Sequence, residues 1–219
     1  MIKKLALLGT VIGLIFSLPA ISAPPPGAPT VNDKEAWDGL TPAAVEKIKK
    51  GEIVIASAQT TTGGGGEAMI QAAMIFDVNI AEAFRIIKET DKQCEFLNNC
   101  DEAILIERTD THDIIEFRVK ILAWELKYRV KHRWDNKKFR MWWTLDPSFN
   151  NDLKHLEGFW QLFYIDDTHT LGRYGTKLIV KEFIPKSVQE ALTKRDLPTV
   201  LEQFRKRVNS HGKFKKKGA

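Results

Sequence analysis

The sequence predicts an α+β protein in which a curved antiparallel β-sheet wraps around a long C-terminal α-helix. Three observations predict this class. Strand-like stretches with one apolar face fill residues 101–183, the two longest being Leu156–Ile165 and His169–Phe183. Ile184-Pro185 then leads into an amphipathic helix that ends near Asn209. Because strict alternation leaves one face of each strand wet, we expect an antiparallel sheet whose apolar face packs on that helix.

The first 22 residues have the pattern of a secretory signal rather than of the fold. Lys3 and Lys4 precede an apolar stretch, residues 5–18, and small residues follow, with Ala20 and Ser22 suited to the −3 and −1 positions. We therefore predict cleavage after Ser22 and an exported protein, periplasmic or extracellular. The alternative is an uncleaved anchor, although the apolar stretch is short for a spanning helix.

Removal of this segment leaves 197 of 219 residues, which suits one domain with a real core. It also lowers the formal net charge from +5 to +3, and four lysines of the last eight residues supply four positive charges, so the rest of the domain is near neutral. The near-neutral body gives no argument for a nucleic-acid partner. The basic tail, residues 212–219, could touch anionic lipid, or it could be a solvated terminus.

Cys94 and Cys100 are the two cysteines of the chain. An even count in an exported protein favours a disulfide between them. A C-x5-C spacing without a nearby histidine is a poor metal site, so we predict no metal and no cofactor.

The first half of the chain predicts a leader, two strands and short helices. Residues 23–40 are Pro-rich and polar, as in a flexible leader. Thr41 and Pro42 open a helix that Gly51 ends, and residues 52–60 and 68–78 are strand-like. Four glycines between these strands fit a hairpin tip better than a phosphate loop, because no Lys-Ser/Thr follows. Asn79 then caps a helix, with Glu82 completing a capping box, and residues 91–98 form a second short helical or irregular piece.

A period of two dominates from Asp101 onward. One strand alternates most regularly, with an apolar face of Trp124, Leu126, Tyr128, Val130, His132 and Trp134. Its other face carries a basic stripe of Lys127, Arg129, Lys131 and Arg133. The stripe could meet anionic headgroups in a transient membrane contact, or it could be a solvated face that resists edge pairing.

The last strand and helix contain expected irregularities. Gly172 and Gly175 interrupt the longest strand and suggest a bulge or a bend. Pro198 should break or kink the final helix, whose apolar stripe includes Leu197, Leu201 and Phe204.

The order of elements and several short motifs resemble the START-like (SRPBCC, Bet v 1-type) superfamily, and most closely its polyketide cyclase and coenzyme Q-binding branch. Asp77-Val78-Asn79 leads into the first helix, residues 158–162 look like the Gly-x-Trp strand of that family, and Thr170, Leu171 and Tyr174 look like its next strand. The final helix closes with Leu201, Phe204, Arg205 and Val208. The resemblance covers about residues 52–211, and we place the domain at 41–211.

This resemblance implies a helix-grip fold with a hydrophobic cavity between the curved sheet and the final helix. Relatives bind lipids, sterols, isoprenoid quinones or polyketides. The residues that we expect to line the ligand site are Phe117, Val119, Trp124, Leu126, Tyr128, Val130, His132, Met141, Trp143, Trp160, Leu201 and Phe204.

Catalysis finds little support in the sequence. There is no G-x-S-x-G and no H-E-x-x-H. His132 shares the apolar face of its strand, so with Tyr128 it could orient a polar ligand head or transfer a proton, or it could be a hydrogen-bonded histidine near a strand end. We name no catalytic residue and favour binding over catalysis.

We therefore expect an exported protein that holds a hydrophobic or amphipathic small molecule, such as a lipid or an isoprenoid quinone, for which lipid transport is one use. Two alternatives stay open. One is a cyclase or aromatase that uses acid/base residues of the cavity. The other is an interaction module whose pocket its own tryptophans fill.

Overall fold

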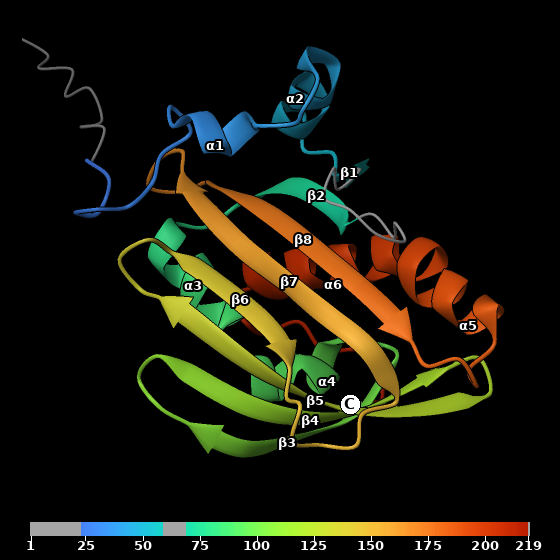
Figure 1. Cartoon of the computed structure of the whole chain (residues 1–219). Helices are drawn as coiled ribbons and strands as arrows, with labels where there is room; N and C mark the ends of the chain where they lie inside the picture. The colour runs from blue at the N-terminus through green and yellow to red at the C-terminus, as the bar shows by residue number, and fades with distance from the viewer. Residues whose placement is uncertain (1–22, 59–68, 219) are drawn as a thin grey trace, which may run out of the picture.

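The computed structural model describes residues 23–58 and 69–218. The predicted signal segment and the glycine tip at residues 63–66 lie outside these ranges. Eight strands form one sheet in the order β1-β2-β8-β7-β6-β5-β4-β3, with every neighbouring pair antiparallel (Figure 1). The strands are β1 (Val54–Ala58), β2 (Met69–Phe76), β3 (Cys100–Arg108), β4 (His112–Ile121), β5 (Trp124–Asp135), β6 (Arg140–Leu145), β7 (Leu153–Tyr164) and β8 (Thr170–Val180).

The sheet curves around helices that pack on its concave face (Figure 1). The helices of the described chain are α1 (Lys34–Trp37), α2 (Pro42–Lys49), α3 (Ile80–Ile87), α4 (Gln93–Phe96), α5 (Lys186–Glu190) and α6 (Leu197–Asn209), with a 3₁₀ turn at Thr90–Lys92 and a π turn at Ala191–Arg195. α3, α4 and α6 share one large core with the inward side chains of the sheet. The expected α+β helix-grip fold is confirmed.

Local sequence signals account for the helix starts. The Thr41 Oγ1 accepts the Ala44 N–H at 3.2 Å, and the Asn79 Oδ1 accepts the Glu82 N–H at 2.9 Å. The Glu82 carboxylate bonds Arg85 at 2.8 Å, one turn along the same helix. α6 is fastened at its other end, where Asn209 exchanges hydrogen bonds with Asp77 at 2.6 and 3.0 Å.

The C-terminal helix is divided before Pro198 rather than kinked at it. The π turn ends with the Asp196 N–H donating to the Ala191 carbonyl at 2.9 Å, and Pro198 stands in the first turn of α6. A proline in the first turn lacks an N–H that would have no helical partner there, so α6 can begin where the longer helix could not continue. The predicted single amphipathic helix is therefore α5, the π turn and α6 in succession.

The strand glycines have a different role from the expected one. The pairing of β7 with β8 shows no register shift at Gly172 or Gly175; its one irregularity lies between Leu153 and His155. A Cβ at Gly172 would lie 2.5 Å from the Phe76 ring, and one at Gly175 would overlap the Phe159 ring. These glycines make room for aromatic rings on the neighbouring strands. Of the two predicted alternatives, a bulge or a bend, the bulge is wrong.

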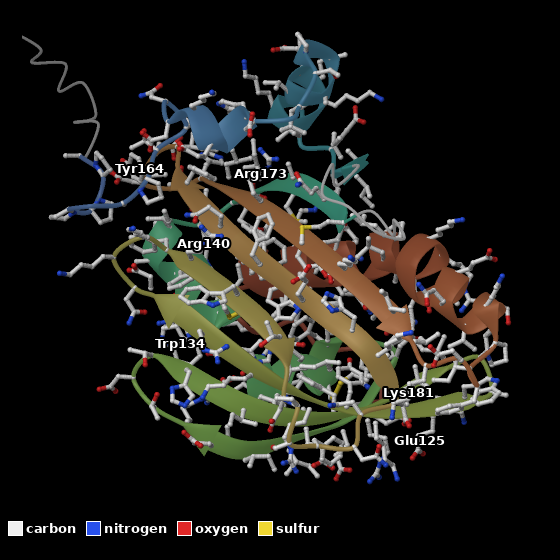
Figure 2. The ribbon with its side chains drawn as sticks, in the orientation of Figure 1. Glu125, Trp134, Arg140, Tyr164, Arg173 and Lys181 are labelled. Carbon is white, nitrogen blue, oxygen red and sulfur yellow. A yellow bond between two sulfur atoms is a disulfide. The ribbon has the colours of Figure 1, made fainter. Side chains whose placement is uncertain are left out.

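The Pro-rich leader packs on the sheet instead of extending freely. Arg173 of β8 is buried on the face opposite the cavity, where it donates to the carbonyls of Ala36 at 2.8 Å and Asp38 at 2.9 Å (Figure 2). The Trp37 Nε1 donates to the Val31 carbonyl, and Ala36 belongs to a second small core with Phe163 and Leu171. The expectation of a flexible leader missed these contacts, because its backbone carbonyls carry no sequence signal.

The basic tail also has partners. The Lys216 N–H donates to the Glu95 carbonyl, and its ammonium donates to the carbonyls of Leu97 and Cys100 at 3.3 and 2.7 Å.

The basic stripe of β5 is partly neutralised, since Arg129 pairs with Glu116 at 2.9 Å and Lys127 with Glu125 at 3.4 Å. Across residues 23–58 and 69–218, no helix is both long and apolar enough to cross a membrane.

Candidate functional site

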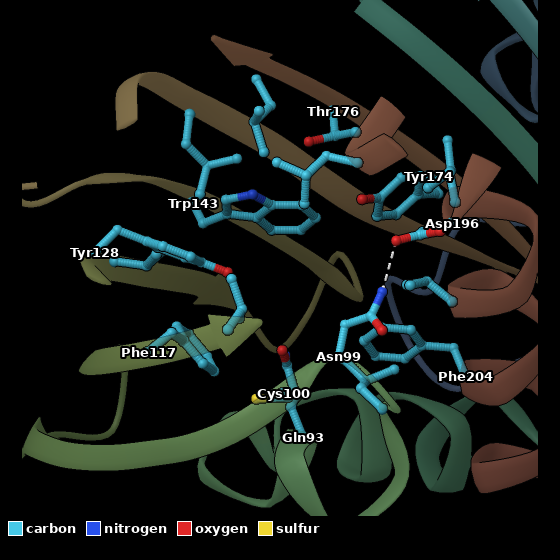
Figure 3. A pocket seen from close by; sticks show the side chains of 18 of the residues that line it. Gln93, Asn99, Cys100, Phe117, Tyr128, Trp143, Tyr174, Thr176, Asp196 and Phe204 are labelled. Atoms are coloured by element: carbon cyan, nitrogen blue, oxygen red, sulfur yellow. Dashed lines mark hydrogen bonds between the residues drawn. The ribbon is translucent and has the colours of Figure 1, made fainter. Parts of the chain in front are cut away.

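A cavity of about 190 Å³ lies between the concave face of the sheet and α6 (Figure 3). β4 to β8 form one wall, and α4, the start of β3, the π turn and α6 form the other. Its lining is mainly aliphatic and aromatic, as is usual for small-molecule sites. The volume lies below the roughly 300–1,000 Å³ typical of sites for drug-sized ligands, so the tryptophans and tyrosines fill part of the space.

Nine of the twelve residues expected at a ligand site line this cavity. They are Phe117, Val119, Tyr128, Val130, His132, Met141, Trp143, Trp160 and Phe204. Trp124, Leu126 and Leu201 do not. Trp124 is half-buried at the end of the β4–β5 hairpin, whereas Leu126 and Leu201 are fully buried in the core.

The structure adds residues that sequence reasoning missed. β8 contributes Tyr174, Thr176 and Leu178, which alternate along one face, so the period of two was a usable signal. The α4–β3 junction contributes Gln93, Leu97 and Asn99, and the π turn and α6 contribute Leu192, Asp196, Leu197 and Val200. These two groups come from irregular segments, in which no periodicity marks an inward face.

A continuous belt of rings runs around the cavity. Successive centroids along Tyr128, Phe117, His132, Trp143, Tyr174, Trp160 and Phe204 lie 4.9 to 6.3 Å apart. Strand register produces the belt, because Phe117 pairs with Tyr128, His132 with Trp143, and Trp160 with Tyr174. Such edge-to-face and tilted ring pairs stabilise a wall that flexible aliphatic side chains could not keep rigid.

His132, which lines the cavity, belongs to a buried hydrogen-bond network. Its Nδ1 lies 2.8 Å from the Oδ1 of Asp113, its direct neighbour on β4. The other oxygen of Asp113 accepts from Thr90 Oγ1 at 2.5 Å and from Arg108 Nη2 at 3.0 Å. Asp113 is fully buried and His132 is 4% exposed. Burial alone would raise the pKa of Asp113, but the hydrogen bonds from His132, Thr90 and Arg108 outweigh it and lower that pKa.

Two tyrosine hydroxyls point toward the space between their rings (Figure 3). Burial raises the pKa of Tyr174 to about 12 and raises that of Tyr128 as well. Both side chains therefore stay neutral over the ordinary pH range and can donate or accept a hydrogen bond. Tyr128 is enclosed by protein yet keeps accessible surface, because it borders the cavity.

One end of the cavity is closed by a hydrogen bond between two segments far apart in the chain. The Asn99 Nδ2 donates to the Asp196 Oδ2 at 2.7 Å (Figure 3), and the Arg195 Nε donates to the other Asp196 oxygen at the same distance. Cys94 and Cys100, which form a disulfide with Cα atoms 4.7 Å apart, hold α4 to the start of β3 beside this closure.

A larger groove of about 980 Å³ adjoins the cavity on the side of α5 and the π turn. The two spaces share Thr176, Leu178 and Leu197 as lining residues. Four lysines border the groove, namely Lys154, Lys181, Lys186 and Lys194.

The described chain brings together no set of histidine, cysteine and carboxylate groups able to hold a metal ion. The polar groups that line the cavity can hydrogen-bond a polar atom of a ligand or move a proton.

Comparisons with known proteins give structural likeness without close sequence relatives. No family model matches the sequence, and no curated protein matches it. Among solved structures, a STAR-related lipid transfer protein from Xanthomonas axonopodis superposes with a TM-score of 0.56 at 11% identity, over 71% of this chain and 93% of that one. The Zhui aromatase/cyclase from Streptomyces sp. R1128 gives 0.56 at 8% identity, over 64% and 92%.

A START superfamily protein from Mycobacterium smegmatis gives a TM-score of 0.54 at 12% identity, over 65% of this chain and 97% of that one. TM-scores above 0.5 establish a common fold, whereas identities this low leave the activity open. The β-strand order, the enclosed α6 and these likenesses agree with one another: the protein has a START-like helix-grip fold.

Proposed function

We propose that this protein binds a hydrophobic or amphipathic small molecule, of the lipid or isoprenoid class, in the cavity between its sheet and α6. The observation that carries the proposal is an apolar cavity, ringed by aromatic side chains, that shares Thr176, Leu178 and Leu197 as lining residues with a larger groove. Burying each CH₂ of a ligand there stabilises the complex by roughly 0.8 kcal/mol, so shape and apolar lining suffice for affinity. The likeness to a STAR-related lipid transfer protein supports the same use.

Native mass spectrometry tests the proposal. The protein is expressed with its own first 22 residues, purified without detergent and measured before and after organic extraction. We expect a stoichiometric mass that extraction removes and that identifies the ligand class. Leu178→Trp places a larger side chain where the cavity and the groove share their lining, and should reduce the bound fraction.

Leu105→Trp is the matched control, because Leu105 is 43% exposed on the edge strand and lines neither the cavity nor the groove. Equal occupancy in both variants would place the ligand elsewhere. An empty protein that gains no mass from added lipids and quinones would leave the filled-pocket module as the better explanation, which the modest cavity volume favours.

A second function, acid/base catalysis of the cyclase type, has one observation in its favour. The Asp113 carboxylate orients His132, which borders the cavity, as a general base requires. The likeness to an aromatase/cyclase supports it at the level of fold. Turnover of a poly-β-ketone substrate that His132→Gln abolishes would favour this function over simple binding.

We also propose that the protein is exported, with cleavage after Ser22. The mass of the N-terminal peptide from the secreted or periplasmic fraction tests this. A peptide beginning at Ala23 supports the proposal, and a chain retaining Met1 in the membrane fraction contradicts it.

A further inference from the structure

His132 has one ring nitrogen satisfied and one unsatisfied. Its Nδ1 is committed to Asp113 at 2.8 Å, whereas its Nε2 has no hydrogen-bond partner in the part of the chain that the structure describes. That atom is not sealed off, although His132 is 96% buried, because the residue lines the cavity. A polar atom that faces an apolar cavity without a hydrogen-bond partner in the protein can be satisfied by a polar atom of a ligand.

The surroundings determine what kind of partner this nitrogen takes. Asp113 already faces the Arg108 guanidinium at 3.0 Å, so its charge is balanced without an imidazolium. The His132 ring packs edge-to-face on Phe117 and against Trp143. In the tautomer of the neutral imidazole whose Nδ1–H donates to Asp113, Nε2 keeps its lone pair. The cavity therefore presents a hydrogen-bond acceptor.

Thr90 and Arg108 fix the orientation of the Asp113 carboxylate that bonds His132. They occupy the second oxygen of Asp113, so that carboxylate cannot rotate away from His132 without breaking both bonds. Asp91 holds Arg108 in place at 2.7 Å. Asp113 thus acts as a positioning residue for the His132 ring.

We propose that the ligand of this cavity carries a hydroxyl group, alcoholic or phenolic, that donates to His132 Nε2 while its apolar body packs on the aromatic belt. This inference rests on the proposed binding function and deepens it by naming the ligand class. Hydrocarbons, ethers and esters without a donor would leave Nε2 unsatisfied, and carboxylates would meet its lone pair with their own. Discrimination of this kind is strong where the wrong ligand leaves a polar group of the site unpaired.

Isothermal titration calorimetry with three matched probes on the delipidated protein tests the inference. The probes are 4-pentylphenol, 4-pentylanisole, which lacks only the O–H donor, and 4-pentylbenzoate. We expect the phenol to bind about tenfold more tightly than the anisole, and the benzoate to bind most weakly. In His132→Phe, the ratio of phenol to anisole affinity should fall to about one, whereas in Tyr128→Phe it should persist.

A spectroscopic measurement does not depend on whether His132→Phe folds. In ¹⁵N-labelled wild-type protein, the phenol should shift the His132 Nε2 resonance, and the anisole should leave it in place. Equal affinity for phenol and anisole, tighter binding of the benzoate, or loss of the preference in Tyr128→Phe alone would each overturn the inference while leaving the proposed function intact. If none of the three probes binds, the proposed function fails first and the inference falls with it.

Discussion

The indole of Trp143 occupies the space in which a side chain at Gly158 would stand. The two residues are direct partners across β6 and β7, and a Cβ at Gly158 would overlap the indole and lie 2.5 Å from the Gly175 carbonyl oxygen. Because Gly158 has no side chain, the Trp143 indole on the neighbouring strand can occupy this space and form part of the cavity wall.

Gly158→Ala should consequently destabilise the protein and displace the wall. Overpacking of a dense interior typically costs about 1–3 kcal/mol, and we expect a loss within that range in the free energy of unfolding by urea. In a Trp143→Phe background the cost should be smaller but not zero, because the Gly175 carbonyl remains. The same cost in both backgrounds would show that Trp143 is not what the new methyl group meets.

Asp113→Asn tests the buried network around His132. The change removes the buried carboxylate that His132 and Thr90 face and leaves Arg108 with Asp91 as its remaining counter-charge, and we expect about 1–3 kcal/mol lower stability at pH 7. Since the folded-state pKa of Asp113 is lowered, its stabilising contribution is present above the unfolded value of 3.8 and is lost as the pH falls through the folded value.

The difference in unfolding free energy between wild type and Asp113→Asn should therefore shrink below about pH 4. The exposed neighbour in Asp110→Asn serves as the control and should show little change at either pH. A difference that stays constant from pH 7 to pH 3 would mean that the carboxylate charge of Asp113 contributes nothing.

Removing the disulfide should cost modest stability. The bridge between Cys94 and Cys100 closes a short loop, with a sequence separation of 6, for which chain entropy predicts about 2 kcal/mol. For a domain of this size, the double variant Cys94→Ala/Cys100→Ala should melt roughly 4–8 °C below the wild type. Wild type in reducing agent should behave like the variant. Alkylation of two thiols in the native, unreduced protein would contradict the bond.

Arg173→Lys should release the N-terminal leader. A guanidinium reaches the Ala36 and Asp38 carbonyls together, and a lysine ammonium cannot reproduce that fork. We expect faster hydrogen exchange in residues 30–40 and a loss of roughly 1 kcal/mol in the free energy of unfolding. Lys177→Met, four residues along the same face of β8, should leave exchange in the leader unchanged. Equally slow exchange in Arg173→Lys would show that other contacts hold the leader.

The sequence determined much of the sheet and of the cavity wall by itself. The alternation from Trp124 to Trp134 placed Tyr128, Val130 and His132 on one face, and the structure puts all three on the cavity. Strand periodicity is a local property, since successive side chains point to opposite faces, so it can be read without knowing the partner strands. The helix caps at Thr41 and Asn79 were equally local, and both are present.

Tertiary structure alone decided which inward residues border empty space. Leu126 and Leu201 have the same apolar pattern as their neighbours, but they pack fully into the core, because cavity boundaries depend on how distant layers fit together. The pairing of His132 with Asp113 depends on the register between β4 and β5, and the closure by Asn99 and Asp196 joins segments 97 residues apart. Contacts of the leader with Arg173 run through backbone carbonyls, which every residue possesses, so no side-chain pattern could reveal them.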